Sequence, residues 1–179
     1  MKKIFLILSL ILLLAAGALY FLKGKSVYDP AKYSLEIRPA DKPFGVGSEI
    51  SFSLPDQFGK SHSLSPETRT MVFAFTKETG HPIKTAMQKQ PKGFLEAHKA
   101  VIVADISAMP TVIQNLFALP DLRKSDYTML LIYDKKMARR LKEGQKTDQV
   151  IVVRLKEGKV TAIEHAKSPE ELIKLISQA

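Results

Sequence analysis

The chain has 179 residues, of which 27 are Lys or Arg and 18 are Asp or Glu, and it contains no cysteine. Its length suits one folded domain, and a content of 45% hydrophobic and 25% charged residues is typical of a globular protein. The absence of cysteine excludes disulfide bonds, thiolate nucleophiles, cysteine-ligated metal centres and a lipid anchor carried on a cysteine. Thiol–disulfide exchange and thiol-dependent peroxidase activity are therefore excluded as well.

The net charge of +9 divides between the N-terminus and the rest of the chain. Lys2, Lys3, Lys23 and Lys25 flank a long apolar run, which leaves a surplus of five positive charges for the remaining residues. A nucleic-acid-binding chain normally concentrates more basic residues on one face, often with aromatic residues between them. We therefore expect no nucleic-acid partner, and we interpret the surplus as mild surface charge that helps solubility, with facing an anionic membrane as a second possible role.

Residues 4–22 form the apolar run, which contains no charged residue. As a helix it would be about 28 Å long, close to the hydrocarbon thickness of a bilayer, so Ile4, Leu14 and Leu22 are expected to lie in the membrane. The run predicts a signal anchor over residues 1–25 that crosses the cell membrane once, with the domain on the extracytoplasmic side by default. The alternative is export followed by cleavage near Ala18, but the length of the run favours an uncleaved anchor.

After the anchor, residues 26–43 are polar and contain prolines that disfavour helix. They are predicted to form a tether, and the domain is predicted to span residues 44–179, beginning near Phe44. Within it, short β-rich runs alternate with helical patterns, which predicts an α/β fold. The expected strands cover residues 50–54, 61–64, 70–75, 100–106, 127–133, 150–155 and 160–163, the last two forming a hairpin.

Three helices are expected within the domain. The first begins at Pro82, the second covers 110–119 with Ser107 as a possible cap, and the third follows Ser168, whose N-cap signal Glu171 completes. In the second helix, residues 117–119 are expected to form a buried helix end that the following proline terminates.

Residues 134–146 carry six basic residues against two acidic ones. If this segment is helical, Met137 and Leu141 lie on one face of the helix. We expect that face to pack on the core while the basic residues remain in solvent. The alternative is a helix that binds a partner or an anionic membrane surface through residues such as Arg139 and Arg140.

The segment Gly47–Lys60 is followed by the strand Met71–Phe75 and then by the segment Thr79–Lys84. In this order, over roughly Phe44 to Ile176, the chain resembles the thioredoxin-like superfamily, and Gly47–Lys60 is similar to the opening hairpin of its peroxiredoxin-like and membrane-tethered branches. The resemblance implies a three-layer α/β/α sandwich behind the N-terminal transmembrane helix. Element order and the ending in a hairpin and a helix are also weakly similar to the exported, cysteine-poor YtfJ-like group.

Redox-active members of this superfamily carry a Cys-Gly-Pro-Cys turn after the first buried strand. The resemblance places Pro82 at the proline of that turn, and Gly80 and Ile83 at its two cysteines. A cis-proline, the second hallmark, would fall at residues 148–150, where the sequence has none. We expect the former thiol-site loop to be a binding site with no catalytic residue and no cofactor, made of Thr79, Gly80, His81, Pro82 and Ile83.

Two functional hypotheses follow. The first is a membrane-anchored, non-redox thioredoxin-like domain that binds or scaffolds another protein of the cell envelope. The alternative is a hydrolase or isomerase that uses His81 with Asp105 near the former thiol site, which requires both side chains in one cleft within hydrogen-bonding reach. No metal site is expected, because the four histidines form no i, i+4 pair and no metal-binding motif.

Overall fold

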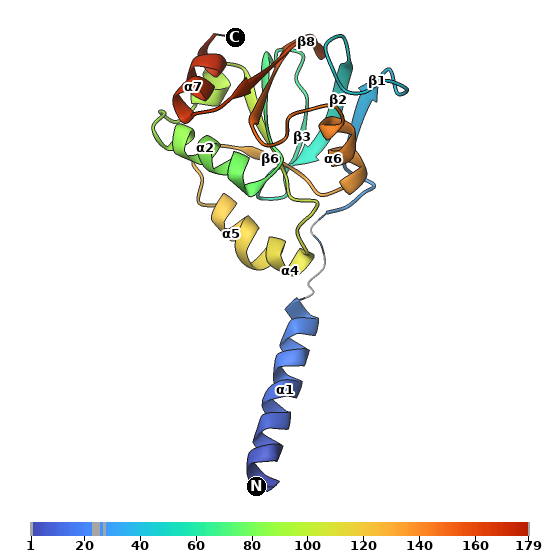
Figure 1. Cartoon of the computed structure of the whole chain (residues 1–179), viewed down its shortest axis with the longest axis vertical. Helices are drawn as coiled ribbons and strands as arrows, with labels where there is room; N and C mark the ends of the chain where they lie inside the picture. Colours follow the sequence, from blue (N-terminus) through green and yellow to red (C-terminus); the bar gives the residue numbers. More distant parts are fainter. Residues whose placement is uncertain (1, 23–25, 27, 179) are drawn as a thin grey trace.

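The structure is a computed structural model that describes residues 2–22, 26 and 28–178 (Figure 1). Its helices are α1 (Lys2–Leu22), α2 (Lys77–Gln88), α3 (Phe94–Ala97), α4 (Thr111–Ile113), the π-helical η1 (Gln114–Ala118), α5 (Leu119–Leu122), α6 (Lys135–Lys142) and α7 (Pro169–Ser177). Its strands are β1 (Ser34–Arg38), β2 (Glu49–Pro55), β3 (Ser61–Ser63), β4 (Thr70–Ala74), β5 (Ala100–Asp105), β6 (Met129–Ile132), β7 (Val150–Lys156) and β8 (Lys159–Ala166).

These strands form one mixed sheet in the order β1-β2-β8-β7-β4-β5-β6, and β3 pairs with β2 outside this path. β4, β5 and β6 run parallel to one another, whereas β7 is antiparallel to both β4 and β8. Every residue of β4 is buried, as expected of an apolar strand that is covered on both faces. β2 pairs with β8 at Glu49, and Asp56, directly after β2, bridges to Leu130 of β6, so the hairpin of β2 and β3 crosses one face of the sheet.

Alternate side chains of the sheet enter two separate hydrophobic cores. On one face Val72 of β4 packs in a core with Ile83 of α2 and Leu172 of α7. On the other face Phe73 packs in a core with Leu141 of α6 and with apolar residues of β2. Helices therefore cover both faces of the sheet, which confirms the predicted three-layer α/β/α architecture.

The C-terminal third of the chain follows the sequence prediction closely. β7 and β8 form the expected hairpin, and its turn holds Glu157 and Gly158 at φ values of 52° and 79°. At the start of α7 the Oγ of Ser168 accepts a hydrogen bond of 3.1 Å from the backbone N–H of Glu171. In α6, Leu141 is buried in the core, which confirms that this basic helix packs through its apolar face.

The segment predicted as a tether contains a strand. Ser34–Arg38 forms β1, which pairs with β2 over its full length and buries Ile37, and Tyr33 just before it is buried as well. The sheet therefore takes in residues that precede Phe44. The sequence of this segment is polar, and it becomes a strand because a partner strand more than ten residues away supplies its hydrogen bonds.

The helix predicted over residues 110–119 is longer and less regular than expected. It runs through α4, η1 and α5 to Leu122, no side chain caps it, and Pro120 lies inside it instead of ending it. Proline lacks an N–H and its ring crowds the carbonyl one turn earlier, and the wider π-helical turn just before it gives it room. Leu119 is buried as predicted, but Phe117 is 64% exposed, so it does not belong to a buried helix end.

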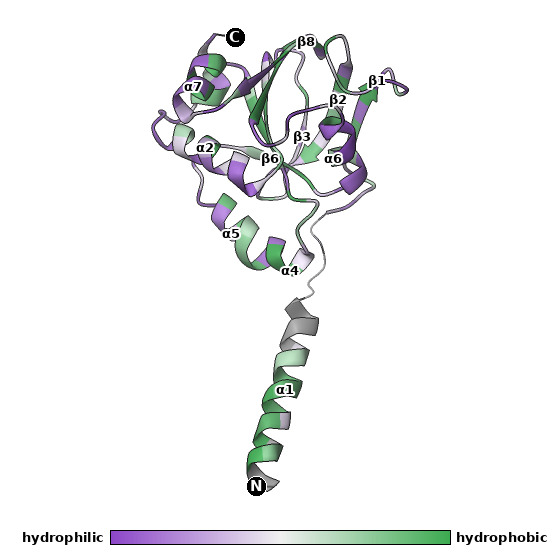
Figure 2. Cartoon of the chain, in the orientation of Figure 1, coloured by the Kyte–Doolittle hydropathy of each residue, from purple (hydrophilic) through white to green (hydrophobic). Residues whose placement is uncertain are grey.

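α1 extends away from the sandwich at the end of the domain where α4 and α5 lie (Figure 1). Hydrophobic residues cover most of its described length (Figure 2). Ile4 and Leu14 are exposed on it, whereas the side chain of Leu22 lies outside the described residues. Counting only the described residues, no helix is long and apolar enough to cross a membrane.

Candidate functional site

The start of α2 directly after the central strand β4 is the position at which the family resemblance predicted a former thiol site. α2 begins at Lys77, five residues before Pro82, so the prediction that Pro82 opens this helix is wrong. Thr76 is the N-cap, and its Oγ1 accepts a hydrogen bond of 3.2 Å from the backbone N–H of Thr79. The Oγ1 of Thr79 in turn accepts hydrogen bonds from the N–H groups of Phe75 and Thr76, at 3.1 and 3.0 Å.

This reciprocal capping box uses both hydroxyl groups to satisfy backbone N–H groups that the helix start would otherwise leave unpaired. The Thr76 hydroxyl also hydrogen-bonds to the Glu78 carboxylate, and the Thr79 hydroxyl donates a hydrogen bond of 3.0 Å to the carbonyl oxygen of Thr76. The helix start therefore has no thiol, and the hydroxyl groups of Thr76 and Thr79 are already hydrogen-bonded. We call it the closed helix start.

The five residues predicted as a binding loop lie along the first two turns of α2 and face different ways. Thr79 and Ile83 are buried, and Ile83 belongs to the core. Gly80 and Pro82 are half-buried, and His81 is exposed and makes no hydrogen bond or ion pair within the described part of the chain. Of the five, Thr79 and Pro82 line a groove.

The groove has a volume of about 140 Å³ and lies between the start of α2 and the segment that leads into β7. Its walls come from three parts of the chain that are distant in sequence: Glu78, Thr79, Pro82, Asp148, Gln149, Val150, Ala166 and Lys167. Residues 148–150, which the resemblance placed at the family's cis-proline, thus lie opposite α2. The backbone N–H of Glu78 and the Thr76 hydroxyl hold the pKa of the Glu78 carboxyl below its ordinary value, so the rim carries a negative charge at neutral pH.

His81 and Asp105, the residues of the alternative enzyme hypothesis, point to different faces of the sheet. α2, which carries His81, covers the face that holds Ala104. Asp105 is the next residue along β5 and faces the opposite side, where its Oδ2 pairs with Nζ of Lys142 in α6. Its Oδ1 accepts a hydrogen bond of 2.9 Å from the N–H of Ser107. The two side chains do not share a cleft, and the enzyme hypothesis built on them is wrong.

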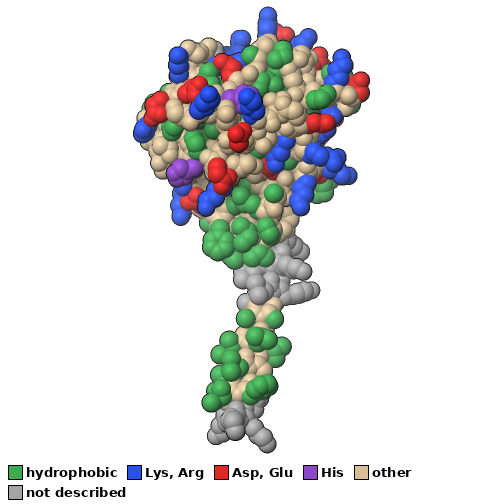
Figure 3. All heavy atoms as spheres, viewed as in Figure 1, with side chains coloured by type: hydrophobic (Ala, Val, Ile, Leu, Met, Phe, Trp, Pro, Cys, Tyr) green, Lys and Arg blue, Asp and Glu red, His purple; other side chains and the backbone are tan. Residues whose placement is uncertain are grey.

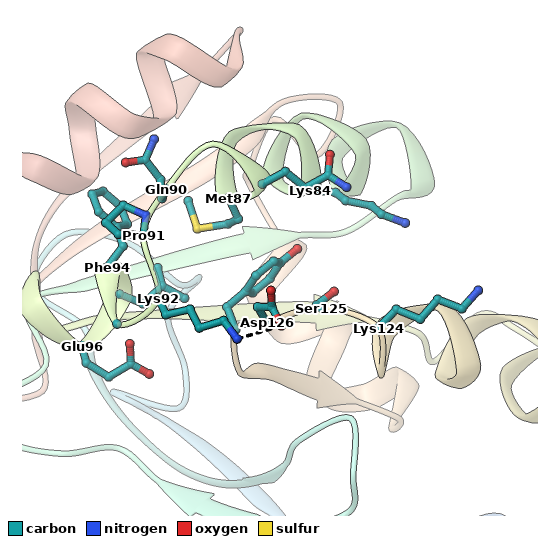
Figure 4. Close-up of a pocket in the computed structure, with 14 residues that line it drawn as sticks. Lys84, Met87, Gln90, Pro91, Lys92, Phe94, Glu96, Lys124, Ser125 and Asp126 are labelled. Atoms are coloured by element: carbon teal, nitrogen blue, oxygen red, sulfur yellow. Dashed lines mark ion pairs between the residues drawn. The ribbon is translucent and has the colours of Figure 1, made fainter.

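A larger cavity of about 370 Å³ lies between the α2–α3 turn and the segment that precedes β6 (Figure 4). Met87, Phe94 and Tyr127 provide its apolar walls, and Lys92 pairs with Asp126 across it at 3.7 Å. Burial raises the pKa of the Tyr127 phenol, which keeps this hydroxyl protonated. None of the lining residues is a histidine, and the cavity combines these apolar walls with charged and hydroxyl side chains.

Solved structures share this architecture. A putative thiol:disulfide interchange protein DsbE from Chlorobium tepidum superposes with a TM-score of 0.52 and 15% sequence identity, covering 76% of this chain and 98% of that one. The exposed lipoprotein thioredoxin Etrx1 from Streptococcus pneumoniae superposes with a TM-score of 0.51 and 13% identity, covering 72% and 99%. The domain has a thioredoxin-like fold. No family model matches the sequence, and neither does any curated protein.

A thioredoxin-like fold without cysteine cannot perform thiol exchange, which needs a thiolate at the helix start. The groove beside that helix start remains as a concave surface with a charged rim. Glu78 and Lys167 line it, and sequence reasoning did not identify either residue. Lys167 has no local signal, because it reaches the groove only through the pairing of β7 with β8.

Proposed function

We propose that this chain is a membrane-anchored, non-redox thioredoxin-like protein that binds a partner protein of the cell envelope on the extracytoplasmic side. The observation that carries the proposal is the groove beside the closed start of α2. Both hydroxyl groups at that helix start are engaged in capping, so the groove retains its shape without a reactive group. Such a surface is suited to binding.

The dimensions of the groove support a protein segment as its occupant. Its volume of about 140 Å³ lies below the roughly 300–1,000 Å³ of pockets that hold small molecules, and it suits one side chain of a bound segment. Glu78 and Asp148 place two carboxylates on the rim against the single ammonium group of Lys167. This balance favours a segment that presents a basic side chain.

The membrane anchor is supported by the sequence, in which residues 4–22 carry no charge and lysines flank both ends. An uncleaved anchor retains Met1 to Ala18 in the mature chain, whereas export and cleavage near Ala18 would remove them. The intact mass of the membrane-extracted protein therefore distinguishes the two. The similarity to the exported YtfJ-like group stays a prediction.

The binding function is tested by photo-crosslinking in cells that express the full-length chain. A photoreactive amino acid in place of Gln149, in the groove, is expected to give a discrete cross-linked product. The same amino acid in place of Lys156 is the matched control, because Lys156 is exposed at the other end of β7, about 20 Å away. Adding Glu78→Lys and Asp148→Lys to the Gln149 probe is expected to remove the product by reversing the charge of the rim. Equal products from both positions, or none from Gln149, would contradict a binding role for the groove.

A further inference from the structure

An apolar ridge formed by Ile113, Leu116 and Phe117 is exposed on α4 and η1. These side chains are 41%, 42% and 64% exposed, and their i, i+3, i+4 spacing places them on one side of the helical segment. Figure 3 shows apolar side chains gathered over α4 and α5 at the end of the domain nearest α1, whereas charged side chains cover much of the rest of that face. A cluster of large apolar side chains on an otherwise charged surface marks a contact surface.

The ridge is held in a fixed position on the domain. The buried side chain of Gln114 donates hydrogen bonds of 3.0 Å from its Nε2 to the carbonyl oxygens of Ile106 and Met109. Leu119, at the end of the same segment, is buried in the core. These contacts attach one side of the segment to the domain and leave the apolar ridge directed outward.

The chain enters the domain from α1 directly beside the apolar ridge. Tyr28 stacks between Tyr33 and Tyr133, with ring centroids 5.7 and 5.3 Å apart. A cavity of about 300 Å³ is lined by Tyr28 together with Pro110 and Gln114, which places this entry point against the start of α4. Only six peptide links separate the end of α1 at Leu22 from Tyr28, a reach of at most about 20 Å.

This short reach matters if α1 lies in a bilayer, the anchoring part of the proposed function on which the present inference rests. The domain then cannot leave the membrane surface by more than about 20 Å at Tyr28. The apolar ridge lies beside that point and is therefore kept close to the lipid headgroups.

α6 begins next to the same entry point and carries exposed cations. Lys135 lines the cavity that Tyr28 shares with the start of α4, and Lys136 and Arg139 follow on α6. All three are exposed and form no ion pair within the described part of the chain. Asp134 directly precedes Lys135 and accepts hydrogen bonds from the first N–H groups of α6, and Glu143 follows Arg139 by four residues at the end of the helix. Apolar side chains flanked by unpaired cations are the composition of a surface that binds anionic lipid.

We propose that the apolar ridge inserts into the boundary between headgroups and acyl chains of the bilayer that α1 enters, with Lys135, Lys136 and Arg139 facing anionic headgroups. The ridge is covered by lipid, and the domain lies against the membrane instead of moving freely above it. Because α4 and η1 then face the bilayer, the orientation of the whole domain relative to the membrane is set.

The chain has no tryptophan, so one introduced tryptophan reports its own surroundings. The probes are Phe117→Trp in the ridge and Val46→Trp, a matched control that is 68% exposed and precedes the end of β2 that pairs with β8. The full-length chain is reconstituted in vesicles that contain anionic and neutral lipid with bromine atoms on the upper acyl chains. Fluorescence at position 117 is expected to be quenched by the brominated lipid and protected from aqueous iodide, and fluorescence at position 46 is expected to show the reverse. Changing Lys135, Lys136 and Arg139 to glutamine is expected to lower quenching at position 117 to the level found with neutral lipid alone.

A third probe, Leu12→Trp in α1, separates this inference from the proposed anchor. If the probe at position 12 is quenched by lipid while the probe at position 117 is quenched only by iodide, the anchor stands and docking of the ridge is wrong. If neither probe is quenched by lipid, both the anchor and the docking are wrong. If the probe at position 117 is protected from lipid and iodide alike, a protein covers the ridge, and this outcome also overturns the lipid assignment.

Discussion

The start of α2 and the apolar ridge on η1 differ in how completely their side chains are partnered. At the start of α2 both threonine hydroxyls are hydrogen-bonded, and Ile83 lies in the core within two turns. On α4 and η1, Phe117 is 64% exposed, and its apolar neighbours Ile113 and Leu116 are 41% and 42% exposed. In a thioredoxin-like fold the first position is where chemistry would be expected, yet here it is the more closed of the two. Among the surfaces that remain available for contact are the groove beside α2 and the ridge.

This difference shows that a helix start without a thiol can contribute to the stability of the fold through hydroxyl groups. Buried polar groups cost free energy unless they are paired, so a helix start without a thiol gains from hydroxyls that cap it. The exposed part of an apolar side chain contributes no burial free energy to the folding of the isolated domain. The first region is thus expected to determine stability, and the second to determine association.

The largest expected effect comes from Thr79→Val, which keeps the shape of the side chain and removes its hydroxyl. The N–H groups of Phe75 and Thr76 lose their acceptor, and we expect the free energy of unfolding to fall by about 2–4 kcal/mol. Thr79→Ser retains the hydroxyl and is expected to lose less than about 1 kcal/mol. Phe117→Ser in the ridge is expected to change stability by no more than about 0.5 kcal/mol. Urea denaturation of the full-length chain in detergent measures all three, and an equal loss from the Thr79→Val and Phe117→Ser variants would remove the distinction between the two regions.

Acid stability provides a smaller effect in the loop that follows β2. Burial alone would raise the pKa of the Asp56 carboxyl, but hydrogen bonds from the His62 ring and from the N–H groups of Lys60 and Phe58 lower it below its usual value of 3.8. The carboxylate therefore stabilises the fold fully above the unfolded pKa near 3.8, and this contribution is lost as the pH falls through the lower, folded value.

We expect the unfolding temperature to decrease below about pH 4, by an amount that corresponds to roughly 1 kcal/mol, the size of a typical hydrogen bond. The Asp56→Asn variant is expected to be less stable at neutral pH, and its unfolding temperature is expected to change less as the pH falls. Thermal scans between neutral and acidic pH give both curves. An Asp56→Asn curve parallel to that of the unmodified chain would show that another carboxyl controls acid unfolding.

Much of the fold was predictable because its signals are local. The hairpin of β7 and β8 is marked by two apolar runs around Glu157 and Gly158, and Ser168 marks the start of α7. β1 was missed because its hydrogen bonds come from β2, which no local pattern in residues 34–38 reveals. Tertiary pairing decided the structure of that segment.

The candidate site was harder to predict for two physical reasons. The capping box at the start of α2 uses Thr79 where the usual signal has glutamate or glutamine, so the sequence pattern favours Pro82 as the first helical residue. The apolar ridge was missed because Phe117 and Leu119 look equally suited to a core, and the π-helical turn of η1 determines which side chain turns outward. Helical periodicity alone does not reveal such a change of direction.

The smallest expected effect concerns where a thiol would be activated in this scaffold. The resemblance assigned the first cysteine position to Gly80, but in the structure Gly80 lies one turn inside α2 and Thr76 is the N-cap. A cysteine at the N-cap has the N–H of Thr79 available to it and the full effect of the helix dipole, which lowers a thiol pKa. A Cβ at Gly80 meets no atom within 4 Å, so the Gly80→Cys variant is sterically tolerated and serves as the matched comparison.

We expect the Thr76→Cys thiol to have a pKa lower than that of the Gly80→Cys thiol by about half a unit, corresponding to a helix-end interaction of about 0.3–1 kcal/mol. The pH dependence of alkylation measures both values. A lower pKa at position 80 would mean that in solution α2 begins later than Lys77, and that the closed helix start is not the state in which a thiol at that position would react.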